Sequence, residues 1–230
     1  MATVLITGAN KGIGLELVKI YANKGDTVLA CCRDAAGADA LNELAGGSDV
    51  RVCEVAVGDG DSVRALADKL KGVTIDLLLN NAGTGGPSPQ NQSALKMDFE
   101  GWAETMNVNT MAPVRMMHAL IENLRSSDNP QVVTITSQMG ALDLDMTMSY
   151  AYCTSKAALN KFMKMAAIEL AKEHIDVCVI HPGWVKTDMG GPGADITPTE
   201  SVEGIANVIA GLNADNTGSF WKWNGEVHAW

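Results

Sequence analysis

The sequence predicts an α/β fold built on a doubly wound parallel sheet of about seven strands, with helices on both faces. Short apolar runs rich in β-branched residues alternate along the chain with longer segments of helical periodicity. The runs are almost continuously apolar, which is typical of parallel strands buried on both faces. A glycine-rich turn joins the first run to the first helical segment. Strands that alternate with helices in this way form right-handed βαβ units.

Each expected element follows from these patterns. The expected strands lie at 3–7, 27–32, 50–55, 75–80, 131–136 and 175–180, with a short seventh near 218–223. The expected helices lie at about 12–24, 35–45, 61–71, 98–125, 152–173 and 199–211. Gly and Pro cluster at 84–89 and 190–198, but the alternation continues past the first cluster and one helix follows the second. We therefore expect residues 1–230 to form a single domain.

Composition disfavours several classes of partner. The 230 residues carry a formal net charge of −10, and the 17 Lys and Arg residues form no run, which disfavours a nucleic-acid or anionic-membrane surface. Neither a signal-peptide pattern nor a membrane-spanning stretch occurs, so we expect a cytoplasmic protein with a small-molecule partner. Five cysteines, two of them adjacent, indicate reduced thiols, and four scattered histidines indicate no metal site.

A tyrosine and a lysine form the first candidate catalytic pair. Tyr152 and Lys156 stand four residues apart, so they share one face of a helix, whereas Tyr150 lacks this spacing. The unperturbed pKa of a phenol is about 10, and a nearby ammonium lowers it. Such a pair could donate and accept a proton, although the spacing alone also arises by chance.

The turn after the first strand is a candidate phosphate site. It reads Thr7-Gly8-Ala9-Asn10-Lys11-Gly12-Ile13-Gly14, with the spacing G-x-x-x-G-x-G. Glycines between a strand and a helix let backbone N–H groups approach a pyrophosphate, and the helix N-terminus adds favourable partial charge. An ordinary tight turn is the alternative, but the flanking strand and helix favour dinucleotide binding.

The glycine spacing resembles that of the short-chain dehydrogenase/reductase family, and further landmarks follow in that family's order. They are Asn80-Asn81-Ala82-Gly83, Asn109, Ser137, Tyr152, Lys156 and Pro182-Gly183, with Thr187 beyond. The resemblance is specific to the single-domain branch and implies a Rossmann fold with strand order 3-2-1-4-5-6-7. The segments after Pro182 and at the end of the chain are similar to the C-factor-like and sniffer-like carbonyl reductases.

The resemblance also implies a reaction. Hydride would pass from a nicotinamide to a carbonyl carbon while Tyr152 protonates the oxygen and Ser137 hydrogen-bonds it. Lys156 would lower the pKa of the tyrosine and hold the ribose, and Asn109, rather than Asn107, would help to hold a water. The implied cofactor contacts are Gly8, Asn10, Lys11, Gly12, Ile13, Gly14, Arg33, Val57, Asn81, Ala82, Gly83, Tyr152, Lys156, Pro182, Gly183, Val185 and Thr187.

Two basic residues favour NADP(H) over NAD(H). Arg33 falls at the end of the second strand, where the family binds the 2′-phosphate, and Lys11 lies in the glycine turn. The alternative is a solvated lysine and an arginine paired with Asp34. Ala56 replaces the aspartate that the family usually places near the adenine, so that contact is in doubt.

The substrate pocket is predicted from two segments that flank the site. The loop between Ser137 and Tyr152 is longer than is usual in the family, and we expect it to contribute to substrate selection. Apolar residues of this loop and of the segment after Gly183 would accept ketones or aldehydes, although such residues are also ordinary core material. The candidates are Met139, Leu144, Met146, Trp184 and Met189.

The resemblance leaves function and assembly with alternatives. The leading function is an NADPH-dependent carbonyl reductase, equivalent to an alcohol dehydrogenase run in reverse. A nucleotide-binding signalling or developmental protein of C-factor type, with little turnover, is the alternative. A sugar-nucleotide epimerase is disfavoured by the short chain. The helices at 98–125 and 152–173 imply a homodimer or homotetramer, although the carbonyl-reductase-like branch includes monomers.

Overall fold

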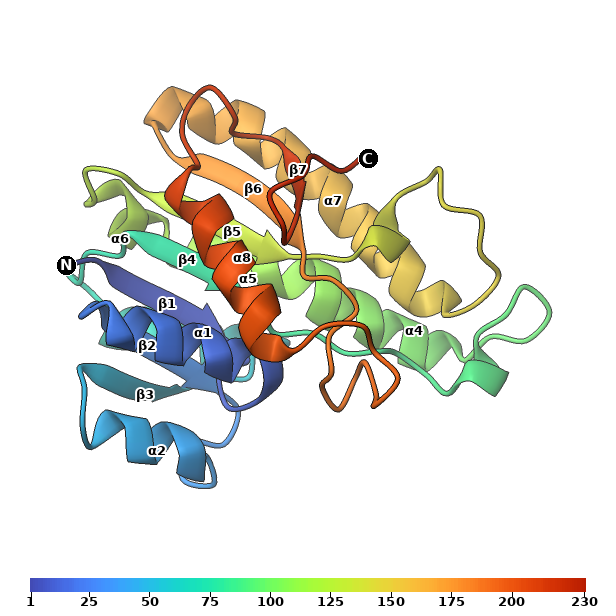
Figure 1. Ribbon diagram of the computed structural model, residues 1–230, viewed down its shortest axis with the longest axis horizontal. Helices are drawn as coiled ribbons and strands as arrows, with labels where there is room; N and C mark the ends of the chain where they lie inside the picture. The colour runs from blue at the N-terminus through green and yellow to red at the C-terminus, as the bar shows by residue number, and fades with distance from the viewer.

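Seven parallel strands form one sheet in the order β3-β2-β1-β4-β5-β6-β7 in the computed structural model, which describes residues 1–230 (Figure 1). All six pairings between neighbouring strands are parallel. The predicted fold class and strand order are therefore confirmed. The strands are β1 (Thr3–Thr7), β2 (Thr27–Cys32), β3 (Val50–Glu54), β4 (Leu77–Asn80), β5 (Gln131–Ile135), β6 (Asp176–His181) and β7 (Phe220–Lys222).

Helices cover both faces of this sheet (Figure 1). One face packs against α1 (Gly12–Asn23), α2 (Asp39–Ala45) and α8 (Pro198–Ala210). The other packs against α3 (Gly60–Lys69), α5 (Ala112–Ala119), α6 (Ile121–Arg125) and α7 (Tyr150–Leu170), and α4 (Phe99–Met106) lies against α7. Alternate residues of each central strand enter opposite cores, as Val4 and Leu5 do. This double burial explains why the strands read as continuous apolar runs.

The prediction of one continuous helix at 98–125 is wrong. It is divided into α4, a π turn at Asn107–Met111, α5 and α6. Pro113 has no N–H and so cannot donate to the carbonyl of Asn109, which interrupts the α-helical pattern at this point. Leu120 then leaves helical geometry, with φ −108° and ψ 13°, and separates α5 from α6.

Two loops extend beyond the carboxyl ends of the strands. One spans residues 81–98 and contains the turn Pro89–Asn91, and the other spans residues 141–149. Both lie at the right of the molecule in Figure 1, together with the first turns of α4 and α7. This end of the sheet therefore carries the segments that the sequence singled out for chemistry.

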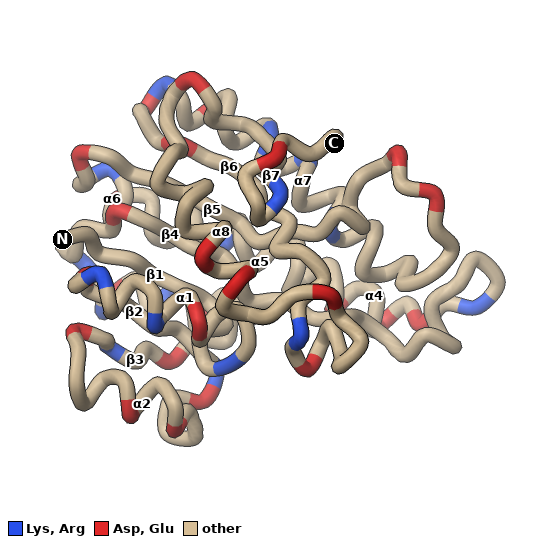
Figure 2. The backbone as a smooth tube through the Cα atoms, in the orientation of Figure 1, with Lys and Arg blue, Asp and Glu red and all other residues tan.

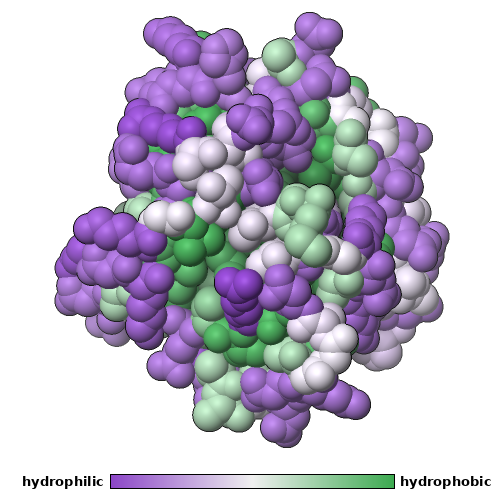
Figure 3. All heavy atoms as spheres, turned by 90° about the vertical axis from the view of Figure 1, so that its left-hand side faces the viewer, coloured by the Kyte–Doolittle hydropathy of each residue, from purple (hydrophilic) through white to green (hydrophobic).

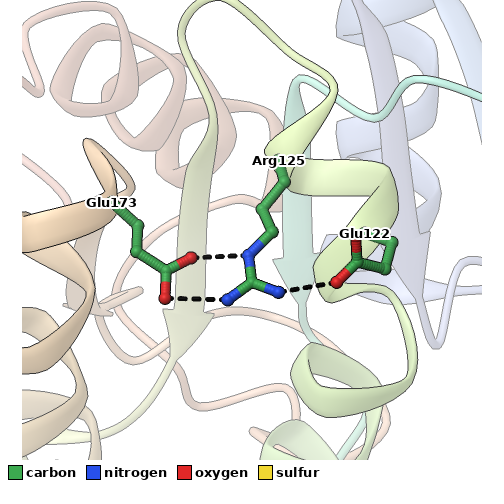
Figure 4. A network of polar contacts seen from close by, with 3 residues as sticks. All are labelled: Glu122, Arg125 and Glu173. Carbon is green, nitrogen blue, oxygen red and sulfur yellow. Dashed lines mark hydrogen bonds and ion pairs between the residues drawn. The ribbon is translucent and has the colours of Figure 1, made fainter.

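An arginine at the end of α6 joins this helix to the short turn that follows α7 (Figure 4). Arg125 Nε and Nη2 donate to the two carboxylate oxygens of Glu173 at 2.6 and 2.8 Å, and Nη1 donates to Glu122 at 2.6 Å. The guanidinium lowers the pKa of Glu173. All three side chains are solvent accessible, so the network fixes geometry more than it adds stability.

Charge is dispersed over the molecule. Figure 2 shows Lys and Arg scattered among Asp and Glu rather than collected on one element. The face at the amino ends of the strands mixes hydrophilic residues with smaller hydrophobic areas (Figure 3). None of the helices has the length and apolar character needed to cross a membrane.

The last residues fold back along β7. Lys222 N–H donates to the carbonyl of Glu226 at 2.8 Å, and His228 N–H donates to that of Phe220 at 2.7 Å. Between them, Trp223 crosses α8 at Gly204, where a Cβ would lie 2.8 Å from Trp223 Cε3 and would clash with the Trp223 carbonyl oxygen. Glycine at this position therefore lets the chain cross directly over the helix.

Gly204→Ala should consequently destabilise the fold. Alanine favours a helix interior by about 1 kcal/mol, but the clash is with backbone, so we expect a net loss on the order of 1–2 kcal/mol in the free energy of unfolding. Gly211→Ala, at the end of the same helix, is the matched control, because a Cβ at Gly211 would lie 3.7 and 3.8 Å from its nearest neighbours. Urea titration of both variants measures the difference, and equal midpoints would contradict the packing described.

Candidate active site

The glycine turn between β1 and α1 leaves room for backbone only. Gly8 and Gly12 have φ of +64° and +54°, which disfavours residues with a side chain. A Cβ at Gly8 would lie 2.9 Å from the Cα of Ala82, and one at Gly14 would clash with the Gly8 carbonyl oxygen. The turn is thus pressed against the chain after β4, and its open side is formed by main chain.

Hydrogen bonds fasten this turn to the end of β4. Thr7 Oγ1 accepts from the N–H groups of Asn81 and Ala82 at 3.0 and 3.1 Å. Asn81 Nδ2 donates in return to the carbonyls of Thr7 and Gly8 at 2.9 and 3.1 Å. β1 and β4 are the strands between which the order of the sheet reverses, and α/β sheets bind ligands in the crevice at such a switch point.

The start of α1 fits a phosphate group. Its N-cap residue, Lys11, makes no side-chain cap, and the first turn carries no acidic residue. By contrast, Asp59, Asp98 and Thr197 cap α3, α4 and α8 with their side-chain oxygens. The first N–H groups of α1 are therefore free of side-chain acceptors and can bind an anion.

The segment from Pro182 to Thr187 lies across the glycine turn. Gly183 has φ +87°, and Val185 is buried and bridges to Ile196. Thr187 Cγ2 lies 3.2 Å from the position that a Cβ on Gly12 would take. The structure therefore brings the glycine turn, the Asn81–Gly83 segment and the Pro182–Thr187 segment together, as the resemblance implied.

The remaining predicted cofactor contacts lie at the margins of this crevice. Asn10 is exposed and Ile13 is partly buried. Val57 is buried, and its carbonyl accepts from Arg115 Nη1 at 2.8 Å. Arg33 is exposed at the end of β2, while Asp34 accepts from Gly37 N–H at 2.9 Å instead of pairing with it.

Lys11 is not simply solvated. Its ammonium donates to Asp188 at 2.8 Å and lowers the pKa of that carboxyl. This exposed pair spans the glycine turn and the chain beyond Thr187. Because the two residues are 177 positions apart, no local pattern could have predicted the pair.

The candidate catalytic residues meet at the carboxyl end of β5. Ser137 follows this strand and is buried, and its Oγ accepts from Met139 N–H at 3.1 Å. Tyr152 and Lys156 lie on the first turns of α7, with Lys156 Nζ 5.8 Å from the centre of the Tyr152 ring. Tyr152 lies within hydrogen-bonding reach of Ser137. Tyr150 precedes them at the start of the helix and is not part of this cluster.

The expectation that Lys156 lowers the pKa of Tyr152 is wrong. Burial raises the pKa of Tyr152 above 10.0, and a hydrogen bond with Ser137 opposes this only in part. Burial of a phenol disfavours the phenolate, and the Lys156 ammonium is not among the causes of the shift. Tyr152 is therefore a protonated hydroxyl at neutral pH, which suits a proton donor.

Lys156 is a buried cation. Its side chain keeps 4% of its surface exposed, and Nζ donates to the carbonyl of Ile135 at 3.0 Å. Burial lowers the pKa of Lys156 to about 8. A Cβ on Gly140 would lie 2.8 Å from the Lys156 carbonyl carbon, so the turn after Ser137 packs directly on the α7 backbone. This packing fixes Ser137 relative to Lys156.

Asn109 points toward the cluster and Asn107 points away from it. Asn109 Oδ1 accepts from Thr84 N–H at 2.8 Å, while Nδ2 donates to the Thr84 carbonyl at 2.8 Å and to Ser155 Oγ at 3.0 Å. Asn107 Nδ2 instead donates to the Gly58 carbonyl at 3.0 Å. Both ends of the Asn109 side-chain amide are thus hydrogen-bonded to other residues of the chain. The backbone carbonyl of Asn109 is the group that lacks an α-helical donor, because Pro113 has no N–H.

The predicted pocket residues are placed unevenly. Met139 and Met146 are partly buried, and Met146 Sδ lies 3.7 Å from Cys153 Sγ on α7. Leu144, Trp184 and Met189 are 41%, 51% and 59% exposed, so they form a loose rim rather than a closed wall.

Gln92 is a site residue that the sequence did not reveal. It is buried in the loop after β4, where Oε1 accepts from Ala151 N–H at 3.1 Å and Nε2 donates to the Pro87 carbonyl. The first bond satisfies an N–H in the first turn of α7, next to Tyr152. A glutamine in a polar loop carries no local signal of this role.

Known proteins are similar to this chain in sequence or in fold. A C-signal protein from Myxococcus xanthus is 36% identical over 170 residues, which cover 73% of this chain and all of that protein. The NADPH-bound carbonyl reductase from chicken fatty liver is 32% identical, with a TM-score of 0.92 over 100% of this chain and 99% of that one. The carbonyl reductase Sniffer of D. melanogaster is 29% identical, with a TM-score of 0.92 over the whole of both chains.

These comparisons confirm the resemblance to C-factor-like and sniffer-like proteins. The family model of the short chain dehydrogenases matches residues 2–195, a span that includes every motif from the glycine turn to Thr187. The chain therefore belongs to the short-chain dehydrogenase family.

Proposed function

We propose that this protein is an NADPH-dependent carbonyl reductase that reduces a ketone or aldehyde to an alcohol. The observation that carries the proposal is the cluster of Ser137, Tyr152 and Lys156 at the carboxyl end of β5, beside the glycine turn. A hydroxyl pair and a buried cation next to a dinucleotide site provide the groups that carbonyl reduction needs.

Each residue has a distinct part in this reaction. The bound nicotinamide supplies the hydride. Ser137 Oγ would hold the carbonyl oxygen of the substrate, and the Tyr152 hydroxyl would donate its proton to that oxygen as negative charge develops. The Lys156 ammonium would bind ribose hydroxyls. Asn109 would help to hold the water through which the proton is replaced.

The protonation state of Tyr152 supports a reaction in the direction of carbonyl reduction. Because burial raises its pKa, the hydroxyl retains its proton at neutral pH. Proton donation then needs no prior protonation step.

The preference for NADPH rests on Arg33. Its guanidinium is exposed at the end of β2, and the neighbouring Asp34 is engaged with Gly37. It is therefore available to bind a 2′-phosphate in bidentate fashion. Lys11 would add a second positive charge by exchanging Asp188 for the phosphate. The similar carbonyl reductase from chicken fatty liver binds NADPH, which supports the same choice here.

Substrate size and assembly follow from exposed apolar residues. The loose rim of Leu144, Trp184 and Met189 favours an open site that accepts varied carbonyl compounds. On α7, Phe162, Met165 and Ile168 are 38%, 56% and 70% exposed along one side of the helix. This side supports a homodimer or homotetramer formed through α7. The proposal also includes a single domain over residues 1–230 and a cytoplasmic location.

A second candidate function is a nucleotide-binding signalling protein with little turnover. It is favoured by the 36% identity to C-signal from Myxococcus xanthus. Mixing the purified protein with NADPH and a panel of ketones and aldehydes, while following nicotinamide absorbance, separates the two. Oxidation of NADPH only when a carbonyl compound is present supports the reductase, and NADPH binding without oxidation supports the signalling protein.

Tyr152→Phe should remove the proton donor and keep the ring. We expect kcat to fall by at least about 100-fold, the lower range for general acid catalysis, while the NADPH affinity changes little. Tyr150→Phe, two residues earlier on the same helix, should keep near wild-type turnover. Steady-state kinetics of both variants checks this, and a Tyr152→Phe enzyme that is folded and within a few-fold of wild type would refute the assignment.

Arg33→Ala should weaken NADPH more than NADH. Loss of a charge-assisted bond to the 2′-phosphate costs about 1.5–3 kcal/mol, which is on the order of 10–100-fold in the NADPH dissociation constant. Arg51→Ala removes the same charge at the opposite end of the sheet and should change neither affinity. Fluorescence titration with both cofactors measures the ratio. Equal weakening of NADH and NADPH would remove Arg33 from the phosphate site.

The buried ammonium of Lys156 should make stability depend on pH. Its folded pKa of about 8 lies below the value of 10.5 for a solvated lysine, so the folded state binds fewer protons than the unfolded state between these values and gains stability as pH rises through them. The gain is at most about 3 kcal/mol. Lys156→Met should lack this rise. Urea unfolding from pH 7 to 10.5 tests it, and parallel curves for the two proteins would contradict a buried cation.

A further inference from the structure

Two cysteines stand side by side near the cofactor end of the sheet. Cys31 on β2 and Cys53 on β3 are direct partners in the parallel register. Neighbouring strands lie about 4.8 Å apart, and side chains at paired positions leave the sheet on the same face. Disulfides need Cα atoms about 4.4–6.8 Å apart, so the backbone already satisfies that requirement.

The side chains share one environment. Cys31 is completely buried in the core beneath α3, and Cys53 packs against that core while keeping part of its surface exposed on the edge strand β3. The neighbouring Cys32 enters the opposite core, and its thiol contacts the carbonyl of Asp34 at 3.4 Å. Cys31 and Cys53 therefore form a pair that excludes Cys32.

The two thiols differ in reactivity. The neighbouring Cys31 thiol, reinforced by Lys69 and Arg51, lowers the pKa of Cys53 to about 7. The neighbouring Cys53 thiol and burial raise the pKa of Cys31. A thiolate is the form that reacts with oxidants. Cys53, the more accessible of the two, is thus the more reactive, and the Cys31 thiol lies beside it.

We propose that Cys31 and Cys53 form a reversible modification site, which hydrogen peroxide converts into an intramolecular disulfide that weakens cofactor binding. The Cys53 thiolate would attack one oxygen of the peroxide, breaking the O–O bond to give a sulfenic acid and hydroxide. Cys31 sulfur would then attack Cys53 sulfur, releasing the sulfenic oxygen as water with the Cys31 proton. The hydroxide takes up the proton that Cys53 released when it ionised, so two thiols lose two electrons in total and one peroxide becomes two waters.

The position of the pair connects it to the cofactor. Arg33 follows Cys31 by two residues, and the strand of Cys53 continues into the segment that holds Val57. A disulfide needs Cβ atoms about 3.5–4.5 Å apart, closer than the strand spacing, so the bond would draw the ends of β2 and β3 together. Displacement of Arg33 would then lower the NADPH affinity. This consequence rests on the proposed function, whereas the disulfide itself does not.

Peptide mapping tests the modification. Native protein is treated with a few equivalents of hydrogen peroxide, the remaining thiols are alkylated, and tryptic peptides are analysed without reduction. Cleavage at Lys24, Arg33, Arg51 and Arg64 places Cys31 and Cys32 in one peptide and Cys53 in another. We expect a cross-link between these peptides that dithiothreitol removes. Cys32→Ser should retain the cross-link, and Cys53→Ser and Cys31→Ala should each lose it.

The contrary outcomes are distinct. A Cys53 sulfinic acid without a cross-link, a bond through Cys32, or a disulfide between two chains would overturn the proposed site. For the effect on binding, NADPH titration of oxidised wild type should show a several-fold higher dissociation constant that dithiothreitol reverses, with no such change in Cys53→Ser. An unchanged constant in cross-linked protein would overturn the effect. Reduced protein that does not bind NADPH at all would instead refute the proposed function.

Discussion

The contact between the ends of β1 and β4 is the constraint on which the site depends. The Thr7 hydroxyl accepts hydrogen bonds from the backbone after β4, and the Asn81 amide donates to the backbone after β1. The glycines after β1 have no side chain that would hold the two segments apart. The crevice at the switch point is consequently lined by main chain, whose geometry is fixed by the sheet. A phosphate group would meet rigid N–H donors rather than side chains that must first be ordered.

The chemistry at β5 depends on a costly burial. The Lys156 ammonium is buried and the Tyr152 phenol is partly buried, and this desolvation lowers the pKa of Lys156 and raises that of Tyr152. Each shift favours the neutral form: Tyr152 keeps its proton, and Lys156, with a pKa of about 8, loses its proton more readily than a solvated lysine does. Close packing of Gly140 on α7 and the Gln92 bond to Ala151 hold these groups in place. Perturbed groups gathered in a crevice are characteristic of active sites.

Local patterns predicted the fold and the candidate site better than the energetics of that site. The ends of β1 and β2 agree with their apolar runs, because double burial demands such runs. Tyr152 was distinguished from Tyr150 because helical spacing decides which residue faces Lys156. The sign of the Tyr152 pKa shift could not be predicted, since desolvation depends on loops distant in sequence. The break at Pro113 did have a local signal, a missing N–H donor, but the apolar periodicity on both sides concealed it.

The π turn at Asn107–Met111 has an evolutionary corollary. A π turn contains one residue more than the α-helical turn it replaces. Removing that residue would rotate everything beyond it by about 100° and move it by about 1.5 Å. Asn107, the first residue of the π turn, binds the β3–α3 loop, whereas Asn109, at its centre, binds Thr84 and Ser155. A deletion would therefore break the alignment that allows both attachments, so single-residue deletions should be selected against here.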